Sequence, residues 1–224
     1  MSTLTVGGQA ITLLPEKAAF VAESRTLLVA DVHIGKAVTF RSFGVPVPRG
    51  TTAETLSALS ALAARLDARR IVVLGDFLHS RRSLAPATMD ALARWRMDHA
   101  ALDLVLVRGN HDARAGDPPA RLGIQVVEEP LALGDLRLCH HPRPLPGAYV
   151  LGGHLHPCVQ LHGRAHDRLR LPCFWFGATV GVLPAFGAFT GMHPIRPVAG
   201  ERVFAIADAH VSELPLGADL LRTG

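Results

Sequence analysis

The chain has 224 residues, of which 49% are apolar and 19% are charged. This composition can bury a sizeable core, and it excludes disorder or collagen-like order for the chain as a whole. The length fits one domain, and we predict a single α/β domain over residues 1–224. The formal net charge of +4 permits a polyanionic partner without requiring one.

The cysteines and the apolar stretches bear on the cellular location. Cys139, Cys158 and Cys173 form no CxxC pair, so we expect neither a disulfide framework nor a zinc ribbon, and a cytoplasmic location is the simplest. The first twenty residues have no basic segment before an apolar run, so we expect no secretory signal. The uncharged stretch Leu171–Ile195 contains too many glycines and prolines for a membrane helix. We expect buried strands and tight turns there, and no membrane partner.

Five short apolar runs predict buried strands, because glycine and polar residues bound them. They are Thr26–Ala30, Ile71–Leu74, Leu104–Val107, Leu136–Cys139 and Tyr149–Leu151. After the first run, Thr51–Glu54 has the spacing of a capping box, and leucines follow at helical spacing as far as Leu66. A second helix is expected from Pro86 to about His99. The order β-α-β-α-β indicates parallel strands, and a β-rich second half follows.

Each of these runs leads into Asp, Asn or His residues. The carboxyl ends of strands line one crevice in an open α/β sheet, so these side chains can converge. The candidate metal ligands are Asp31, His33, Asp76, Asn110, His140, His154 and His156. They are too many for one ion and sufficient for two if one carboxylate bridges. The alternative is that polar residues at strand ends only cap turns. The ordered set as a whole favours a hydrolytic site with two metals.

The doublet His140–His141 leaves the choice of ligand open by one residue. The position directly after the strand favours His140, because side-chain alternation points His141 the other way.

In chain order, these motifs resemble the signature of calcineurin-like metallophosphoesterases over roughly residues 25–195: Asp31-x-His33, Gly75-Asp76, Gly109-Asn-His-Asp112, a lone histidine and Gly153-His-x-His156. Four further segments resemble the bacterial ligase-associated DNA damage response endonucleases (PdeM-type): Asp31–Lys36, Phe43–Pro48, Gly75–Ser80 and Leu183–Gly191. The resemblance implies an αββα sandwich, with two mixed sheets flanked by helices.

The resemblance also implies a role for each matching residue. Asp31, His33 and His156 would hold one divalent ion, Asn110, His140 and His154 would hold the second, and Asp76 would bridge them. The activated hydroxide would attack phosphorus. His111 would protonate the leaving oxygen or stabilise the transition state, and Asp112 would orient His111. The relatives favour Mn²⁺, while iron or zinc would suit the same ligands.

The implied function is a DNA endonuclease, acting on single-stranded DNA in DNA repair, with DNA-repair proteins as possible partners. Substrate-binding candidates are Arg49, Arg81, Arg114 and His79, and for His79 a purely structural role is the alternative. The same metal centre would also serve a phosphatase or a small-molecule or cyclic-nucleotide phosphodiesterase, so this second function stays open. The oligomeric state is open as well.

Overall fold

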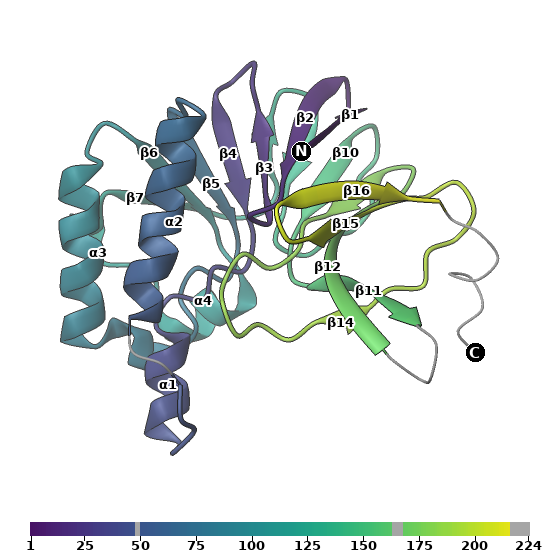
Figure 1. Ribbon diagram of the computed structural model, residues 1–224. Coiled ribbons are helices and arrows are strands. Elements are labelled where there is room, and N and C mark those ends of the chain that lie inside the picture. The colour runs from purple at the N-terminus through teal and green to yellow at the C-terminus, as the bar shows by residue number, and fades with distance from the viewer. Residues whose placement is uncertain (48–49, 163–167, 216–224) are drawn as a thin grey trace.

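The computed structural model describes residues 1–47, 50–162 and 168–215. In these ranges the chain forms two β-sheets that pack face to face, with helices against the first sheet (Figure 1).

The first sheet runs in the order of the sequence, from β1 to β7. Its strands are β1 (Ser2–Val6), β2 (Gln9–Leu14), β3 (Ala18–Val21), β4 (Thr26–Val29), β5 (Arg70–Leu74), β6 (Asp103–Val107) and β7 (Ile124–Val127). The strands from β1 to β4 pair antiparallel, whereas β4, β5, β6 and β7 pair parallel. The parallel half therefore directs the carboxyl ends of β4, β5 and β6 to one edge.

The helices lie in the part of the chain that connects β4 to β7. They are α1 (Lys36–Ser42), α2 (Thr51–Arg65), α3 (Pro86–Asp98) and α4 (Asn110–Ala115), with short 3₁₀ turns η1 (Arg81–Leu84) and η2 (Ala120–Leu122). The two predicted helices are confirmed as α2 and α3. The predicted capping box is wrong: Gly50 is the N-cap of α2, and its carbonyl accepts the Glu54 N–H at 2.9 Å. Because Thr51 is already inside the helix, its hydroxyl cannot act as the cap.

The second sheet has the order β14-β11-β12-β13-β10-β9-β8, and β15 extends it by pairing with β12 and β16. Its strands are β8 (Leu131–Leu133), β9 (Leu136–Leu138), β10 (Tyr149–Gly152), β11 (Pro157–His162), β12 (Arg168–Phe176), β13 (Val180–Val182), β14 (His193–Pro194), β15 (Arg202–Ala207) and β16 (His210–Leu214). The expected β-rich second half is confirmed. The segment Leu171–Ile195 forms strands and turns, and no described helix has the length and apolar character needed to cross a bilayer.

The alternation of side chains along the parallel strands separates two apolar cores. Leu27, Ile71 and Leu104 face α2 and α3, whereas their neighbours Leu28 and Val72 face the second sheet. Both faces of the first sheet are therefore buried, as expected for continuous apolar strands. The prediction of two mixed sheets with flanking helices is confirmed. In the described residues the long helices contribute to the core on one face of the first sheet only.

Candidate metal centre

The seven predicted ligands come together where the strands of both sheets end. Asp31 and His33 follow β4, Asp76 follows β5, and Asn110 opens α4 after β6. The second sheet adds His140 after β9, and His154 and His156 after β10. Ligand atoms of Asp31, His33 and His156 lie within 4.8 Å of one another, and so do those of Asp31, Asp76 and His140.

Asn110 and His154 join the second group through His140. The Asn110 Oδ1 lies 2.9 Å from His140 Nε2, and the His154 Nδ1 lies 3.1 Å from the same nitrogen. The member common to both carboxylate-containing groups is Asp31. The assignment of Asp76 as the bridging ligand remains a prediction.

Most of the candidate ligands have a strained backbone. Positive φ angles between 46° and 67° occur at Asp31, His33, Asp76, His154 and His156. A residue other than glycine rarely adopts this conformation, which costs of order 1–3 kcal/mol and concentrates at functional sites. The left-handed conformation turns the chain sharply after each strand, and these turns bring the ligand side chains into one cluster.

Two glycines of the motifs allow the ligands to approach one another closely. A Cβ at Gly75 would lie 2.0 Å from His140 Nδ1, and a Cβ at Gly109 would lie 2.3 Å from Asp76 Oδ1. Each contact is far shorter than a van der Waals contact. Gly75 and Gly109 are therefore required by the packing of the ligands themselves, and Gly75 is required also by its positive φ of 79°.

Backbone carbonyls orient the histidine rings. The Nδ1–H of His140 donates to the carbonyl of Leu74 at 3.1 Å, and the Nδ1–H of His156 donates to the carbonyl of Gly191 at 3.1 Å. Each bond leaves the Nε2 lone pair directed into the cluster, as is typical of metal-binding histidines. Burial lowers the pKa of His140 and of His154, and it lowers the pKa of His33 to about 2. For His33, His140 and His154 these shifts favour the neutral ring, which is the form that metal ligation requires.

One carboxylate oxygen of the cluster is buried without a hydrogen bond from any described residue. Asp31 is fully buried, and its Oδ1 has no hydrogen-bond partner among the described residues. Burial raises the pKa of Asp76, and the neighbouring Asp31 carboxylate raises it further, although the His111 N–H acts in the opposite direction. A buried carboxylate oxygen without a partner is costly, and a bound cation removes that cost. The residues therefore fit a pair of divalent cations.

Both histidines of the doublet approach the cluster, since ligand atoms of His140, His141 and His154 lie within 4.8 Å of one another. The His140 ring is fully buried, whereas the His141 Nδ1 faces the Glu129 carboxylate at 3.2 Å. These positions favour His140, and its assignment as the ligand stays a prediction. The alternation argument was wrong for His141, since its ring contacts the His140 and His154 rings at centroid distances of 4.6 and 4.8 Å. The strand β9 ends at Leu138, so strand alternation no longer applies at these positions.

Sequence reasoning missed Glu129. Its Oε2 accepts the backbone N–H groups of both His140 and His141, at 2.8 and 2.9 Å. Burial opposes ionisation of Glu129, but these hydrogen bonds prevail and lower its pKa. The residue lies in the connection between β7 and β8. No motif marked it, because its role depends on the pairing of distant segments.

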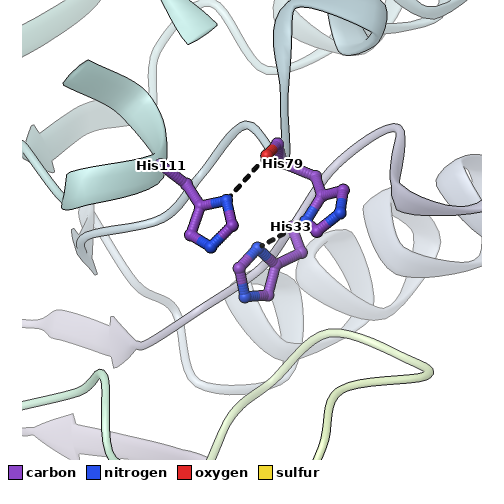
Figure 2. Close-up of side chains that lie close together, drawn as sticks. All are labelled: His33, His79 and His111. Atoms are coloured by element: carbon purple, nitrogen blue, oxygen red, sulfur yellow. Dashed lines mark hydrogen bonds between the residues drawn. The ribbon is translucent and has the colours of Figure 1, made fainter. Parts of the chain in front are cut away.

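His111 lies beside the cluster and is one-third exposed at its side chain. Its Nδ1–H donates to the His79 carbonyl at 2.8 Å, which leaves Nε2 3.9 Å from the Asp76 Oδ2. Figure 2 shows this bond and the His79 ring, whose Nδ1 lies 3.4 Å from the His33 Nδ1. Burial lowers the pKa of His79 to about 4. The structure thus places His79 against His33 and His111, and its role in substrate binding stays a prediction.

The predicted contact between Asp112 and the His111 ring is absent, and this expectation is corrected. The fully buried Asp112 carboxylate accepts backbone N–H groups of Phe77, Leu78 and Gly109 at 2.9–3.3 Å. Burial raises its pKa to about 6, although these hydrogen bonds oppose the rise. Asp112 therefore ties the turn after β5 to the start of α4, while the His79 carbonyl orients the His111 ring.

The rim of the cluster is basic on the side of α4 and η1. Arg81 and Arg114 are exposed, and the Arg81 Nε–H donates to the Arg114 carbonyl at 3.4 Å. Arg49 lies outside the described residues. Arg108, another basic residue at a strand end, forms ion pairs with Asp117 and Glu128. A basic side chain that is already paired contributes little to the attraction of a polyanion.

Comparisons with known proteins identify the family of the chain. The family model of the calcineurin-like phosphoesterases matches residues 24–141. Among solved structures, the nuclease MPE of Pseudomonas putida is 46% identical, with 95% of this chain and 99% of that chain covered and a TM-score of 0.85. Yfce, a phosphoesterase from E. coli, is 16% identical, with 86% and 99% covered and a TM-score of 0.41. The search among curated proteins found no match. The chain therefore belongs to the calcineurin-like phosphoesterase family and is a metallophosphoesterase.

Proposed function

We propose that the chain is a DNA endonuclease that hydrolyses phosphodiester bonds with two divalent ions. The observation that carries this proposal is the unpartnered, buried Asp31 Oδ1 at the centre of the histidine and aspartate cluster. The similarity to a nuclease over nearly the whole length of both chains supports nucleic acid as the substrate.

Each group of residues has its own task in this reaction. Asp31, His33 and His156 would hold one ion, Asn110, His140 and His154 the other, with Asp76 between them. Such a pair supplies Lewis-acid activation of water and neutralises charge on the phosphate. His111 presents its Nε2 at the partly exposed edge of the cluster, where it would donate a proton to the leaving oxygen. The His79 carbonyl holds the ring in that orientation.

DNA as the substrate is supported by the basic rim. Arg114 follows His111 by three residues in α4, and the exposed Arg81 donates to its carbonyl, so the two arginines would attract the phosphates that flank the scissile bond. We propose single-stranded DNA as the form cleaved and DNA repair in the cytoplasm as the setting. Manganese is the proposed metal because the family resemblance favours it, and the nitrogen and oxygen ligands also suit iron or zinc.

The test uses metal-stripped protein, added Mn²⁺ and closed circular single-stranded DNA. A circle has no ends, so a linear product reports internal cleavage. His111→Ala controls for contaminating nuclease, and parallel reactions with iron and zinc test the metal. Cleavage by the wild type alone supports the proposal.

An intact circle together with hydrolysis of bis(p-nitrophenyl) phosphate would retain the phosphoesterase chemistry and refute DNA as the substrate. Phosphomonoesters and cyclic nucleotides would then be tested, since the same centre suits a phosphatase or a small-molecule phosphodiesterase. A second check is ionic strength. DNA binding should weaken steeply with salt, because the contacts proposed are to phosphates.

A further inference from the structure

An exposed aromatic side chain follows a buried segment next to the metal centre. Leu183, Ala185 and Phe186 are at most 7% exposed, whereas Phe189 is 50% exposed. The backbone of Phe189 has a positive φ of 58°. For a bulky residue this conformation is an outlier, and it is maintained only where the surroundings impose it.

The segment that carries Phe189 is attached to the metal centre on both sides. Before it, the Gly187 N–H donates to the backbone carbonyl of Asp31 at 3.1 Å. After it, the carbonyl of Gly191 accepts the His156 Nδ1–H at 3.1 Å. Two residues that contact predicted ligands of the same ion therefore bracket Phe189. The segment around Phe189 is therefore held against the residues that follow β4 and β10.

Phe189 lines two hollows, and one of the two lysines of the chain lines each of them. The first hollow, of about 210 Å³, is lined by His156, Met192, Lys17 and Phe189 itself. Phe189 lines the second hollow together with His33 and Lys36. The first volume is below the roughly 300–1,000 Å³ of pockets for drug-sized ligands, so it suits a single planar ring system. An aromatic face and a cation beside a metal ligand are the elements of a nucleotide subsite.

We propose that Phe189 stacks against a base of the nucleic-acid substrate next to the scissile phosphate, and that Lys17 contacts a flanking backbone phosphate. This inference rests on the proposed nuclease function. Stacking is tolerant of sequence because every base has a π-face, so the subsite would select for nucleic acid over other phosphodiesters without selecting a sequence.

The test compares a single-stranded DNA oligonucleotide with an oligomer of equal length made only of abasic residues. The two carry the same backbone charge and differ only in their bases. The readout is the kcat/KM for the DNA oligonucleotide divided by the kcat/KM for the abasic oligomer. In Phe189→Ala this ratio should be roughly 5- to 100-fold lower than in the wild type, because only the DNA loses a stacking contact. Phe189→Trp should keep the wild-type ratio, whereas Phe189→Leu should behave like the alanine variant. Met97→Ala, an exposed apolar residue of α3, is the matched control and should leave the ratio as in the wild type.

Binding of the labelled oligonucleotides to metal-free protein gives a second readout that does not depend on turnover. Phe189→Ala should weaken binding of the DNA more than binding of the abasic oligomer. Lys17→Gln should weaken both equally and reduce the slope of log K against log salt by about one.

An unchanged ratio in Phe189→Ala, or an equal loss on both oligomers, would overturn the stacking assignment while the nuclease proposal stands. Wild-type protein that hydrolyses bis(p-nitrophenyl) phosphate but cleaves neither oligomer would overturn both proposals.

Discussion

The helix-covered face of the first sheet and its carboxyl edge are built from the same strands, yet they differ in almost every physical respect. On the face, Leu27, Ile71 and Leu104 pack with α2 and α3 in ordinary backbone conformations. At the edge, Asp31 and Asp76 follow the same strands with positive φ and buried carboxylates.

The difference shows that the helix-covered face contributes to the free energy of folding, whereas the carboxyl edge reduces it. Apolar burial on the face contributes stability in proportion to the area removed from water. The edge combines backbone strain with buried charge, and both reduce stability until a cation binds. Changes at the edge should therefore abolish activity, and changes on the face should reduce stability. Four predictions test this contrast, from the largest effect on activity to the smallest.

Asp76→Ala should lose both metals and reduce hydrolysis to background, because the predicted bridging carboxylate is removed. Metal content after reconstitution with Mn²⁺ measures the effect. Asp103→Ala, an exposed residue at the opposite end of the parallel strands, is the control. If Asp76→Ala retained a full pair of ions, the bridge assignment would fail, and Asp31 would take its place.

His111→Ala should lower kcat about 10²- to 10⁴-fold and leave metal content as in the wild type, because the ring lies beside the cluster without being one of its predicted ligands. Turnover and bound metal are measured on the same sample. His210→Ala, an exposed histidine of β16, is the matched control. Loss of metal from His111→Ala would make it a ligand and refute its catalytic assignment.

Glu129→Gln should weaken metal affinity about 10- to 100-fold, because the carboxylate fixes the backbone of His140 and His141. Activity should recover as Mn²⁺ is raised. Titration of activity with Mn²⁺ measures the shift. Glu128→Gln changes the neighbouring residue, which pairs with Arg108 at the surface, and should have no effect on the titration. If the Mn²⁺ titration curves of Glu129→Gln and Glu128→Gln were equal, Glu129 would have no role in metal binding.

Leu59→Ala should lower the free energy of unfolding by about 2–5 kcal/mol, because the side chain is fully buried between α2 and the sheet. Activity per folded molecule should equal that of the wild type. Urea unfolding and kcat at a temperature where the protein is folded measure the two effects. A large loss of kcat in the folded variant would show that face and edge are coupled.

The candidate ligands and their order along the chain could be predicted from the sequence, because the patterns that mark them are local. Each strand is a short apolar run, and each ligand lies within a few residues of the end of its strand. The parallel arrangement then brings the ends together without further information. The helices α2 and α3 were predictable for the same reason, since apolar spacing within one segment defines them.

Contacts between distant segments were decided only by the tertiary structure. The Glu129 carboxylate reaches the backbone of His140 and His141 because β8 and β9 pair antiparallel. This pairing brings the residue before β8 next to the residues after β9. The Asp112 carboxylate binds the backbone after β5, which is 34–35 residues away in sequence, instead of the neighbouring His111 ring. The segment that carries Phe189 is likewise attached by hydrogen bonds of Gly187 and Gly191 to residues that follow distant strands. The sequence by itself determined which residues reach the edge, because strand period and turn chemistry are local. The hydrogen-bond partners of these side chains and their orientation depend on tertiary packing, because a buried polar group bonds to whichever partner the fold brings within reach.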